Sequence, residues 1–355
     1  MQHGVKRVSL SEEAKRSKLE KDQIKIKKYR DLTSEIFELR DKKTYNDEAL
    51  LKTNEILLIN PEFYTMWNYR REILNTYKPD LTVYEDILNQ DLNFVLAQLK
   101  RFPKCYWIWN HRRWLLFELV SIGKVNWKYE FGIVSKLLEL DQRNYHGWHY
   151  RRFVVSNMEL ECKDDLPKIL KINLDEFNYT TQKIQKDFSN FSAWHNRAKL
   201  IPKIHDLIHK NQGLPSSSET DLFQNTKSIL DNDLEMIKTG IYMSPEDTSV
   251  WYYLQWLLSD PFFKNGFESK EDYLEVLNQQ LQVIDEVNEM EKEDTGKDNV
   301  GCLKNIVFIK SLIQQENNQD KLTDEIKEAL KILTEIDPLR KNKYLQQLAG
   351  KVEIC

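Results

Sequence analysis

Phe102-Pro-Lys-Cys-Tyr-Trp-Ile-Trp-Asn-His-Arg-Arg-Trp-Leu-Leu116 is the fullest copy of a unit that recurs along the chain. The unit begins with a turn residue, places an aromatic residue three positions before a tryptophan, and continues Trp-x-x-Arg-Arg into an apolar pair. Further copies stand at residues 60–74, 141–155, 187–201 and 244–258, and the last has lost both arginines. Spacings of 42, 39, 46 and 57 residues separate the anchoring tryptophans, which are Trp67, Trp109, Trp148, Trp194 and Trp251. Periods in this range are typical of helical-hairpin repeats.

These repeats predict an all-α fold, a right-handed superhelical solenoid (a crescent) of antiparallel helical hairpins. Stacked hairpins share one continuous core, so we expect a single domain over residues 1–355. Residues 1–44 would form an N-terminal arm and a basic helix, and residues 45–260 would form the five tandem repeats. Residues 261–355 would form C-terminal helices with a degenerate sixth repeat.

Inside each repeat the tryptophan is predicted to be a packing residue, because a buried indole removes roughly 150–250 Å² from water. For the arginines four residues later, Arg71, Arg113 and Arg152, the sequence leaves two roles open. They could bond to the ends of a neighbouring hairpin or to acids on the first helices, or they could face a partner. In the first repeat Asn60 is expected to cap the second helix, with Pro61 at its first helical position.

Composition narrows the class of protein. A net charge of −4 and a basic first helix without interleaved aromatic residues give no reason to expect a nucleic-acid partner. The sequence has no apolar run long enough to cross a bilayer. Its cysteines are scattered, which disfavours a disulfide framework and a zinc site within the chain and suggests a cytoplasmic protein; they are Cys105, Cys162, Cys302 and Cys355.

Two consecutive turns carry extra polar residues at the start of a second helix, where free N–H groups and the helix dipole favour an anion. Lys104 and Tyr106 stand at one turn, and Asn144, Tyr145 and His146 stand at the next. If the hairpins stack, these side chains could bind a phosphate or diphosphate. Ordinary solvated turns would have the same composition. The sequence shows no nucleophile paired with a base, no phosphate loop and no metal-ligand cluster, so a complete active site is not expected.

The tandem Trp-x-x-Arg-Arg hairpins resemble the α subunits of the protein prenyltransferases. The opening His3-Gly-Val-Lys-Arg7 and the copies around Trp109 and Trp148 are most similar to those of the Rab (type II) geranylgeranyltransferases. The resemblance implies an obligate heterodimer in which the α crescent wraps around a β subunit. The β subunit would hold the zinc ion and the isoprenoid pocket, and this chain would bind no metal.

The resemblance also assigns roles to residues. Lys104, Tyr106 and His146 would be catalytic, and Lys104, Asn144, Tyr145 and His146 would bind the substrate diphosphate. His3 would be able to approach the zinc of the partner as an autoinhibitory contact. Relatives of the farnesyltransferase type have a glutamine that reads the carboxylate of a C-terminal tetrapeptide, and here that position is Trp107.

The expected function is that of the α subunit of a heterodimeric Rab geranylgeranyltransferase. The enzyme would transfer geranylgeranyl from geranylgeranyl diphosphate to C-terminal cysteines of Rab GTPases presented by an escort protein. One alternative is the α subunit shared by farnesyltransferase and type I geranylgeranyltransferase, which a glutamine at position 107 would have favoured. The other is a non-catalytic helical-repeat adaptor, which would have no obligate partner.

Overall fold

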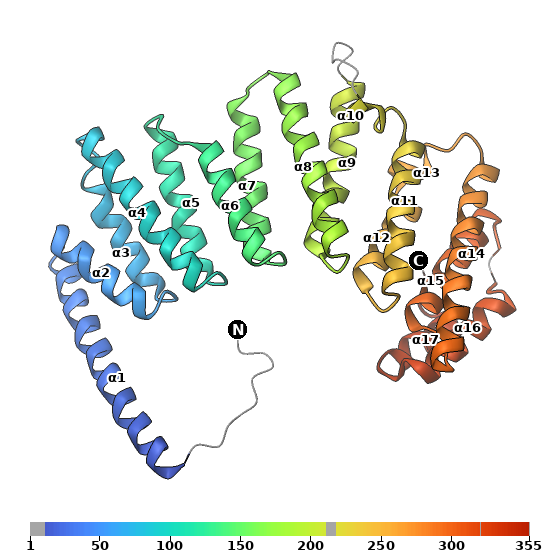
Figure 1. The fold of residues 1–355 in the computed structure, drawn as a ribbon, viewed down its shortest axis with the longest axis horizontal. Coiled ribbons are helices and arrows are strands. Elements are labelled where there is room, and N and C mark those ends of the chain that lie inside the picture. The colour runs from blue at the N-terminus through green and yellow to red at the C-terminus, as the bar shows by residue number, and fades with distance from the viewer. Residues whose placement is uncertain (1–10, 211–217, 320, 355) are drawn as a thin grey trace. The chain divides into compact units, whose positions relative to one another are not determined.

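The computed structural model describes residues 11–210, 218–319 and 321–354, and within these ranges it contains helices and no strand. His3 lies outside the described residues. The helices are labelled in Figure 1, and their bounds are α1 Glu12–Asp41, α2 Asp47–Ile59, α3 Tyr64–Asn75, α4 Leu81–Arg101, α5 Tyr106–Ser121, α6 Trp127–Leu140, α7 Tyr145–Glu161, α8 Leu166–Lys186, α9 Phe191–His209, α10 Ser218–Asp221, α11 Thr226–Met243, α12 Thr248–Ser259, α13 Pro261–Lys264, α14 Lys270–Thr295, α15 Val300–Glu316, α16 Asp324–Ile336, the 3₁₀ helix η1 Pro338–Arg340 and α17 Lys341–Leu348.

The chain divides into two compact units, Met1–Val154 and Val155–Cys355. In each unit the helices pack as antiparallel hairpins side by side, so the predicted all-α hairpin stack is confirmed. That both units belong to one domain stays a prediction. No helix among the described residues is long and apolar enough to cross a membrane.

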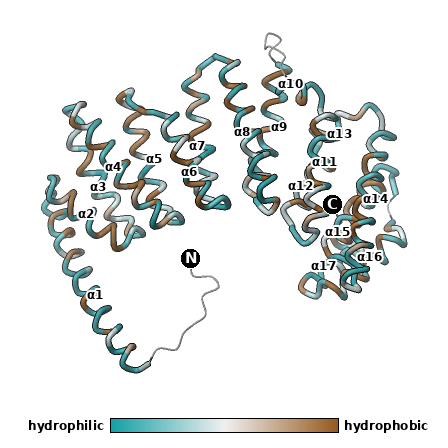
Figure 2. The backbone as a smooth tube through the Cα atoms, viewed as in Figure 1, coloured by the Kyte–Doolittle hydropathy of each residue, from teal (hydrophilic) through white to brown (hydrophobic). Residues whose placement is uncertain are grey.

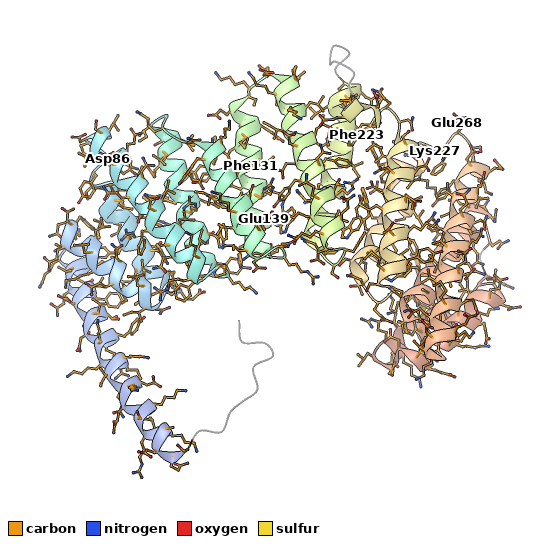
Figure 3. All side chains as sticks on the ribbon, viewed as in Figure 1. Asp86, Phe131, Glu139, Phe223, Lys227 and Glu268 are labelled. Carbon is orange, nitrogen blue, oxygen red and sulfur yellow. The ribbon has the colours of Figure 1, made fainter. Side chains whose placement is uncertain are left out.

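The first unit begins with α1, which Ser11 caps by accepting a hydrogen bond from the amide of Ala14. Only the second half of α1 packs on α2, where Leu32 and Ile36 are buried. Along the first half the residues are largely hydrophilic and their side chains project on all sides of the helix (Figures 2 and 3). The hairpins α2–α3 and α4–α5 follow, and α6 and the start of α7 complete the unit.

In the second unit the hairpins α8–α9 and α11–α12 carry the last two tryptophans. Three further long helices, α14, α15 and α16, pack in sequence, and α16 pairs with α17. Tyr344 of α17 stands seven residues after Asp337, as Trp67 stands seven residues after Asn60. Its buried hydroxyl donates to the Asp337 carboxylate at 2.6 Å. This contact fixes the last helix on the preceding turn.

All five repeat tryptophans are buried. In every repeat the indole Nε1 also donates to the backbone carbonyl six residues earlier, at 2.7–2.9 Å, and the acceptors are the carbonyls of Pro61, Pro103, Gln142, Phe188 and Pro245. The tryptophan therefore fixes the turn that precedes its helix as well as filling the core. A helical-hairpin turn of constant length results.

This bond explains why the expected start of the second helix in the first repeat is wrong. Asn60 lies at the end of α2, and α3 begins only at Tyr64. The carbonyl of Pro61 accepts from the indole of Trp67 at 2.8 Å. Since this carbonyl is directed at the indole, the residues from Pro61 to Phe63 form the turn between the helices.

Buried ion pairs join successive repeats. Arg112 of α5 donates twice to Glu130 of α6, with Nε–Oε2 at 2.9 Å and Nη2–Oε1 at 2.6 Å, and both side chains are almost fully buried. The hydroxyl of Tyr150 on α7 donates to the same carboxylate at 2.8 Å. One acid thus holds together an arginine from the preceding repeat and a tyrosine from its own.

The same arrangement recurs on both sides of this site. In the second unit Arg197 donates twice to Asp233, at 2.8 and 2.6 Å. In the first unit Arg70 donates to Asp91, which also contacts His111 Nε2 at 2.7 Å. Burial would raise the pKa of Asp91, but the charges of Arg70 and His111 and their hydrogen bonds lower it to about 2. The carboxylate is therefore ionised at neutral pH.

Candidate functional site

Three successive turns of the first unit are bonded to one another. Cys105 Sγ donates to the Pro61 carbonyl at 3.4 Å, and Asn144 Nδ2 donates to the Pro103 carbonyl at 3.2 Å. Each carbonyl thus accepts the indole N–H of its own repeat and one side chain of the next. We call the surface formed by residues 60–64, 102–107 and 141–146 the turn rim. The structure brings all five polar residues singled out in the sequence onto this rim.

Aromatic rings cover the turn rim. Tyr106 meets His146 edge to face, with ring centroids 4.2 Å apart, and the ring centroid of Tyr145 lies 5.7 Å from that of His146. Tyr64 and Trp107 form a second pair at 5.3 Å. Tyr106 and Tyr145 are 59% and 61% exposed, so their hydroxyls are open to a ligand while their rings hold His146.

Positive charge collects at the start of α5. No side chain caps this 16-residue helix, so its first N–H groups have no side-chain acceptor. Lys104 lies just before the helix, is exposed and forms no ion pair within the described part of the chain. A cation beside an uncapped helix N-terminus forms a site for an anion.

The imidazole of His146 lies within the field of this cation. Burial lowers the pKa of His146, the charges of His149 and Lys104 lower it further, and Glu62 opposes them. The ring is therefore neutral near pH 7 and offers one N–H donor. At the turn rim, Lys104 supplies the charge, and the phenol and imidazole groups supply directional hydrogen bonds.

Asn144 differs from the other residues of the rim because it is buried, at 5% exposure. Its Nδ2 donates to the Pro103 carbonyl at 3.2 Å, and its Oδ1 accepts from the amide of Gly147 at 3.0 Å. The side chain thus caps α7 and clamps two turns together. Its expected contact with a diphosphate stays a prediction.

Replacing Asn144 with serine should keep the cap of α7 and break the bond to Pro103. We expect the free energy of unfolding to fall by about 1 kcal/mol, the usual contribution of one such hydrogen bond. Asn144→Ala should cost about 1 kcal/mol more, since it also removes the cap. Urea unfolding of both variants measures this difference. Loss of anion affinity by the serine variant at wild-type stability would contradict the clamp.

The described residues provide neither a metal site nor an activated thiol on the turn rim. No group of three or more His, Cys, Asp or Glu side chains within residues 11–210, 218–319 and 321–354 is placed to hold a metal ion. Burial raises the pKa of Cys105 to about 11, so this thiol is protonated at neutral pH. The side chains described on the turn rim can bind and stabilise an anion, but none of them is a nucleophile.

The arginines predicted as repeat residues lie on the second helices and are only partly buried. Arg71 donates through Nε to His111 Nδ1 at 3.2 Å. Arg113 lies over the ring of Phe153, with its guanidinium carbon 4.7 Å from the centroid, and Arg152 occupies the same position on α7. The buried ion pairs instead use the arginine one residue earlier in each motif, which the sequence analysis did not single out.

Two signals in the sequence could have identified these buried pairs. The first arginine of the motif persists in the fourth repeat as Arg197, where the second is replaced by Ala198. An acid also stands 18 residues before four of the tryptophans, and these acids are Asp91, Glu130, Glu176 and Asp233. Each of these acids is buried on the first helix of its repeat, and this burial explains the constant spacing from the tryptophan.

Comparison with known proteins supports the five repeats identified in the sequence. Five segments match the protein prenyltransferase alpha subunit repeat, at residues 46–77, 88–119, 127–158, 173–204 and 230–260. A solved structure described as "Candida albicans protein geranylgeranyltransferase-I complexed with GGPP" has a similar fold, with a TM-score of 0.60 at 20% identity. The similarity covers 92% of this chain and 91% of that one.

Sequence similarity extends over whole chains. The geranylgeranyl transferase type-2 subunit alpha of Candida albicans is 71% identical, over 100% of this chain and 99% of the relative. The subunit of the same name from Saccharomyces cerevisiae is 37% identical, over 98% of both chains. That of Schizosaccharomyces pombe is 39% identical over 96% of both. This chain therefore belongs to the protein prenyltransferase α subunit family, in its geranylgeranyl transferase type-2 branch.

Proposed function

We propose that this chain is the α subunit of a heterodimeric Rab geranylgeranyltransferase and that its turn rim binds the departing diphosphate. The enzyme transfers a geranylgeranyl group from geranylgeranyl diphosphate to C-terminal cysteines of Rab GTPases presented by an escort protein. The observation that carries the proposal is the placement of Lys104 beside the uncapped start of α5 and next to His146. Membership of the type-2 branch supplies the identity of the reaction.

In this reaction the cysteine sulfur forms a bond to the first carbon of the lipid, while the bond from that carbon to the diphosphate oxygen breaks. Negative charge therefore grows on the leaving diphosphate. Lys104 and the free N–H groups of α5 stabilise that charge where it develops. The phenols of Tyr106 and Tyr145, whose rings pack against His146, donate hydrogen bonds to the leaving group, and the neutral ring of His146 adds one more.

We assign the protein thiol and its activation to the partner subunit and its substrate. A zinc ion bound by the partner would keep the attacking sulfur as a thiolate. The turn rim contributes anion binding alone, because its buried thiol is protonated and the described residues offer no metal cluster. Contact of His3 with that zinc stays a prediction.

The partner is expected to cover the turn rim. Tyr64, Tyr106 and Tyr145 occupy the same motif position in three successive repeats and are 54–61% exposed. A row of large exposed aromatic residues is typical of a protein interface. We also place the enzyme in the cytoplasm, since the three described cysteines are unpaired thiols.

Reconstitution of the heterodimer tests this function. The chain is co-expressed with candidate prenyltransferase β subunits, and the purified complex is given geranylgeranyl diphosphate. We expect prenylation of a Rab–escort complex and little or none of a protein ending in a tetrapeptide box. Trp107 cannot replace the glutamine that reads the carboxylate of such a box.

Two other results would contradict the proposal. Preference for the tetrapeptide substrate would favour the α subunit shared by farnesyltransferase and type I geranylgeranyltransferase. A stable monomer that forms no complex with any candidate β subunit would favour a non-catalytic adaptor. A complex that forms and prenylates Rab proteins supports the assignment.

A further inference from the structure

The second arginine of each Trp-x-x-Arg-Arg motif forms a row along the second helices of the first unit. Arg71 lies on α3, Arg113 on α5 and Arg152 on α7, each four residues after its tryptophan. We call these three side chains the guanidinium row. The row is confined to the first unit, since the fourth and fifth repeats have Ala198 and Gln255 at this position.

Stacking on an aromatic ring of the following repeat orients two of the three side chains of the row. The guanidinium carbon of Arg71 lies 5.6 Å from the ring centroid of Trp114, and that of Arg113 lies 4.7 Å from the centroid of Phe153. Trp114 and Phe153 each stand five residues after the tryptophan of the following repeat. The geometry therefore repeats along the stack. A guanidinium fixed against a ring has lost rotamer freedom before any ligand arrives.

No carboxylate of the described residues pairs with the row. Burial lowers the pKa of Arg71 and of Arg152; no carboxylate offsets this effect, and at Arg152 the phenol of Tyr145 opposes it. The Nε atom of Arg113 is buried without a hydrogen-bond acceptor among the described residues. Burial lowers the pKa of His149, and the charges of Arg113 and Arg152 lower it further, so a neutral imidazole lies within the positive field of the row.

The first arginine of the motif, one residue before the row, shows how this fold surrounds an arginine that is paired with a carboxylate. Arg70 and Arg112 are buried and bonded to the carboxylates of Asp91 and Glu130. Burying a guanidinium without an acceptor costs free energy, and a bidentate carboxylate offsets that cost. Within the described ranges such acids pair with the first arginine of the motif and none pairs with the second.

We propose that the guanidinium row is a docking surface for carboxylates on an acidic face of the partner β subunit. This inference rests on the proposed heterodimer. The row lies on α3, α5 and α7, the helices whose first residues form the turn rim, so one partner can cover both. Neighbouring packed helices lie about 8–10 Å apart, so the matching acids should have a similar spacing.

A partition experiment tests the proposal in the assembled enzyme. A limiting amount of β subunit is co-expressed with tagged wild-type chain and an untagged competitor, and mass spectrometry measures the ratio of the two in the purified heterodimer. The Arg113→Met/Arg152→Met competitor loses two charged hydrogen-bonded contacts to the β subunit. We therefore expect its share of the purified heterodimer to be at least about tenfold below that of an untagged wild-type competitor. An unchanged share overturns the proposal.

Two controls separate docking from folding. Lys128→Glu makes the same net charge change, −2, on an exposed site of α6, a first helix, and should keep the wild-type share. In urea the full-length Arg113→Met/Arg152→Met chain should unfold at the wild-type concentration, because neither arginine has a carboxylate partner among the described residues. A variant that unfolds at much lower urea overturns the docking role, since the arginines would then serve the fold.

Labelling identifies the ligand of the row. Carbodiimide coupling of glycine ethyl ester marks exposed carboxylates, and we expect β-subunit acids to be protected by the wild-type chain and labelled with the double variant. Weaker binding of geranylgeranyl diphosphate at an unchanged share would show that the row binds the lipid diphosphate, which overturns the proposal. A wild-type heterodimer that fails to prenylate Rab proteins would refute the proposed function and leave the docking result standing.

Discussion

Replacing Lys104 with alanine should lower the rate of prenyl transfer in the reconstituted heterodimer by about 10²–10³-fold. Removal of one preorganised group that stabilises a developing negative charge usually has an effect of this size. The affinity for geranylgeranyl diphosphate should change far less, because the charge on the leaving group is greatest in the transition state. Single-turnover kinetics gives the rate, and a fluorescent lipid diphosphate gives the affinity.

Lys100→Ala is the matched control for this prediction. Lys100 is exposed in the last turn of α4, four residues before Lys104, and lies outside the turn rim. Replacing Lys100 should leave the rate of prenyl transfer and the affinity for geranylgeranyl diphosphate unchanged. Lys104→Arg keeps the charge and should retain more activity than Lys104→Ala. Turnover by Lys104→Ala at the wild-type rate would show that the turn rim does not stabilise the diphosphate.

Replacing Arg112 with methionine should destabilise the chain by about 3–5 kcal/mol, the usual cost of removing one partner of a buried ion pair. The change leaves the carboxylate of Glu130 buried with Tyr150 as its remaining donor. The free energy of unfolding can be measured in urea by tryptophan fluorescence, because the anchoring indoles of the repeats become exposed on unfolding.

The neighbouring Arg113 provides the comparison for this variant. Arg113→Met makes the same chemical change one residue later, where the described part of the chain provides no carboxylate partner, and should leave the unfolding midpoint near that of the wild type. The double change Arg112→Met/Glu130→Met should recover most of the lost stability, since it removes both charges from the interior. Equal midpoints for Arg112→Met and Arg113→Met would contradict the assignment of the buried pair.

Much of the fold follows from the spacing of a few residues. The tryptophan anchors predicted the hairpins, because an aromatic residue large enough to bury a two-helix unit recurs at a helical-repeat period. The starts of α5, α6, α7 and α9 agree with the sequence pattern. Where the pattern failed, at Asn60 and Pro61, a hydrogen bond from Trp67 overrode the local preference for a helix start.

The sequence predicted which residues belong to the candidate site better than it predicted their contacts and burial. Lys104, Tyr106 and His146 could be placed on adjacent turns because stacked hairpins align their turns. The burial of Asn144 and its bond to Pro103 depend on a contact between residues 41 positions apart, which a single sequence does not encode locally. The choice between the two arginines of each motif likewise depended on which side of the helix meets the next repeat.

The bond from each repeat tryptophan to its own turn bears on how the chain tolerates changes in length. Between each turn and its tryptophan the count is fixed at six residues in all five repeats, since a shift of one position would carry the indole N–H away from its carbonyl. The varying distance between anchors, from 39 to 57 residues, must therefore be absorbed elsewhere. Insertions and deletions should accumulate between one hairpin and the next, at the opposite ends of the helices, and be excluded from the turns.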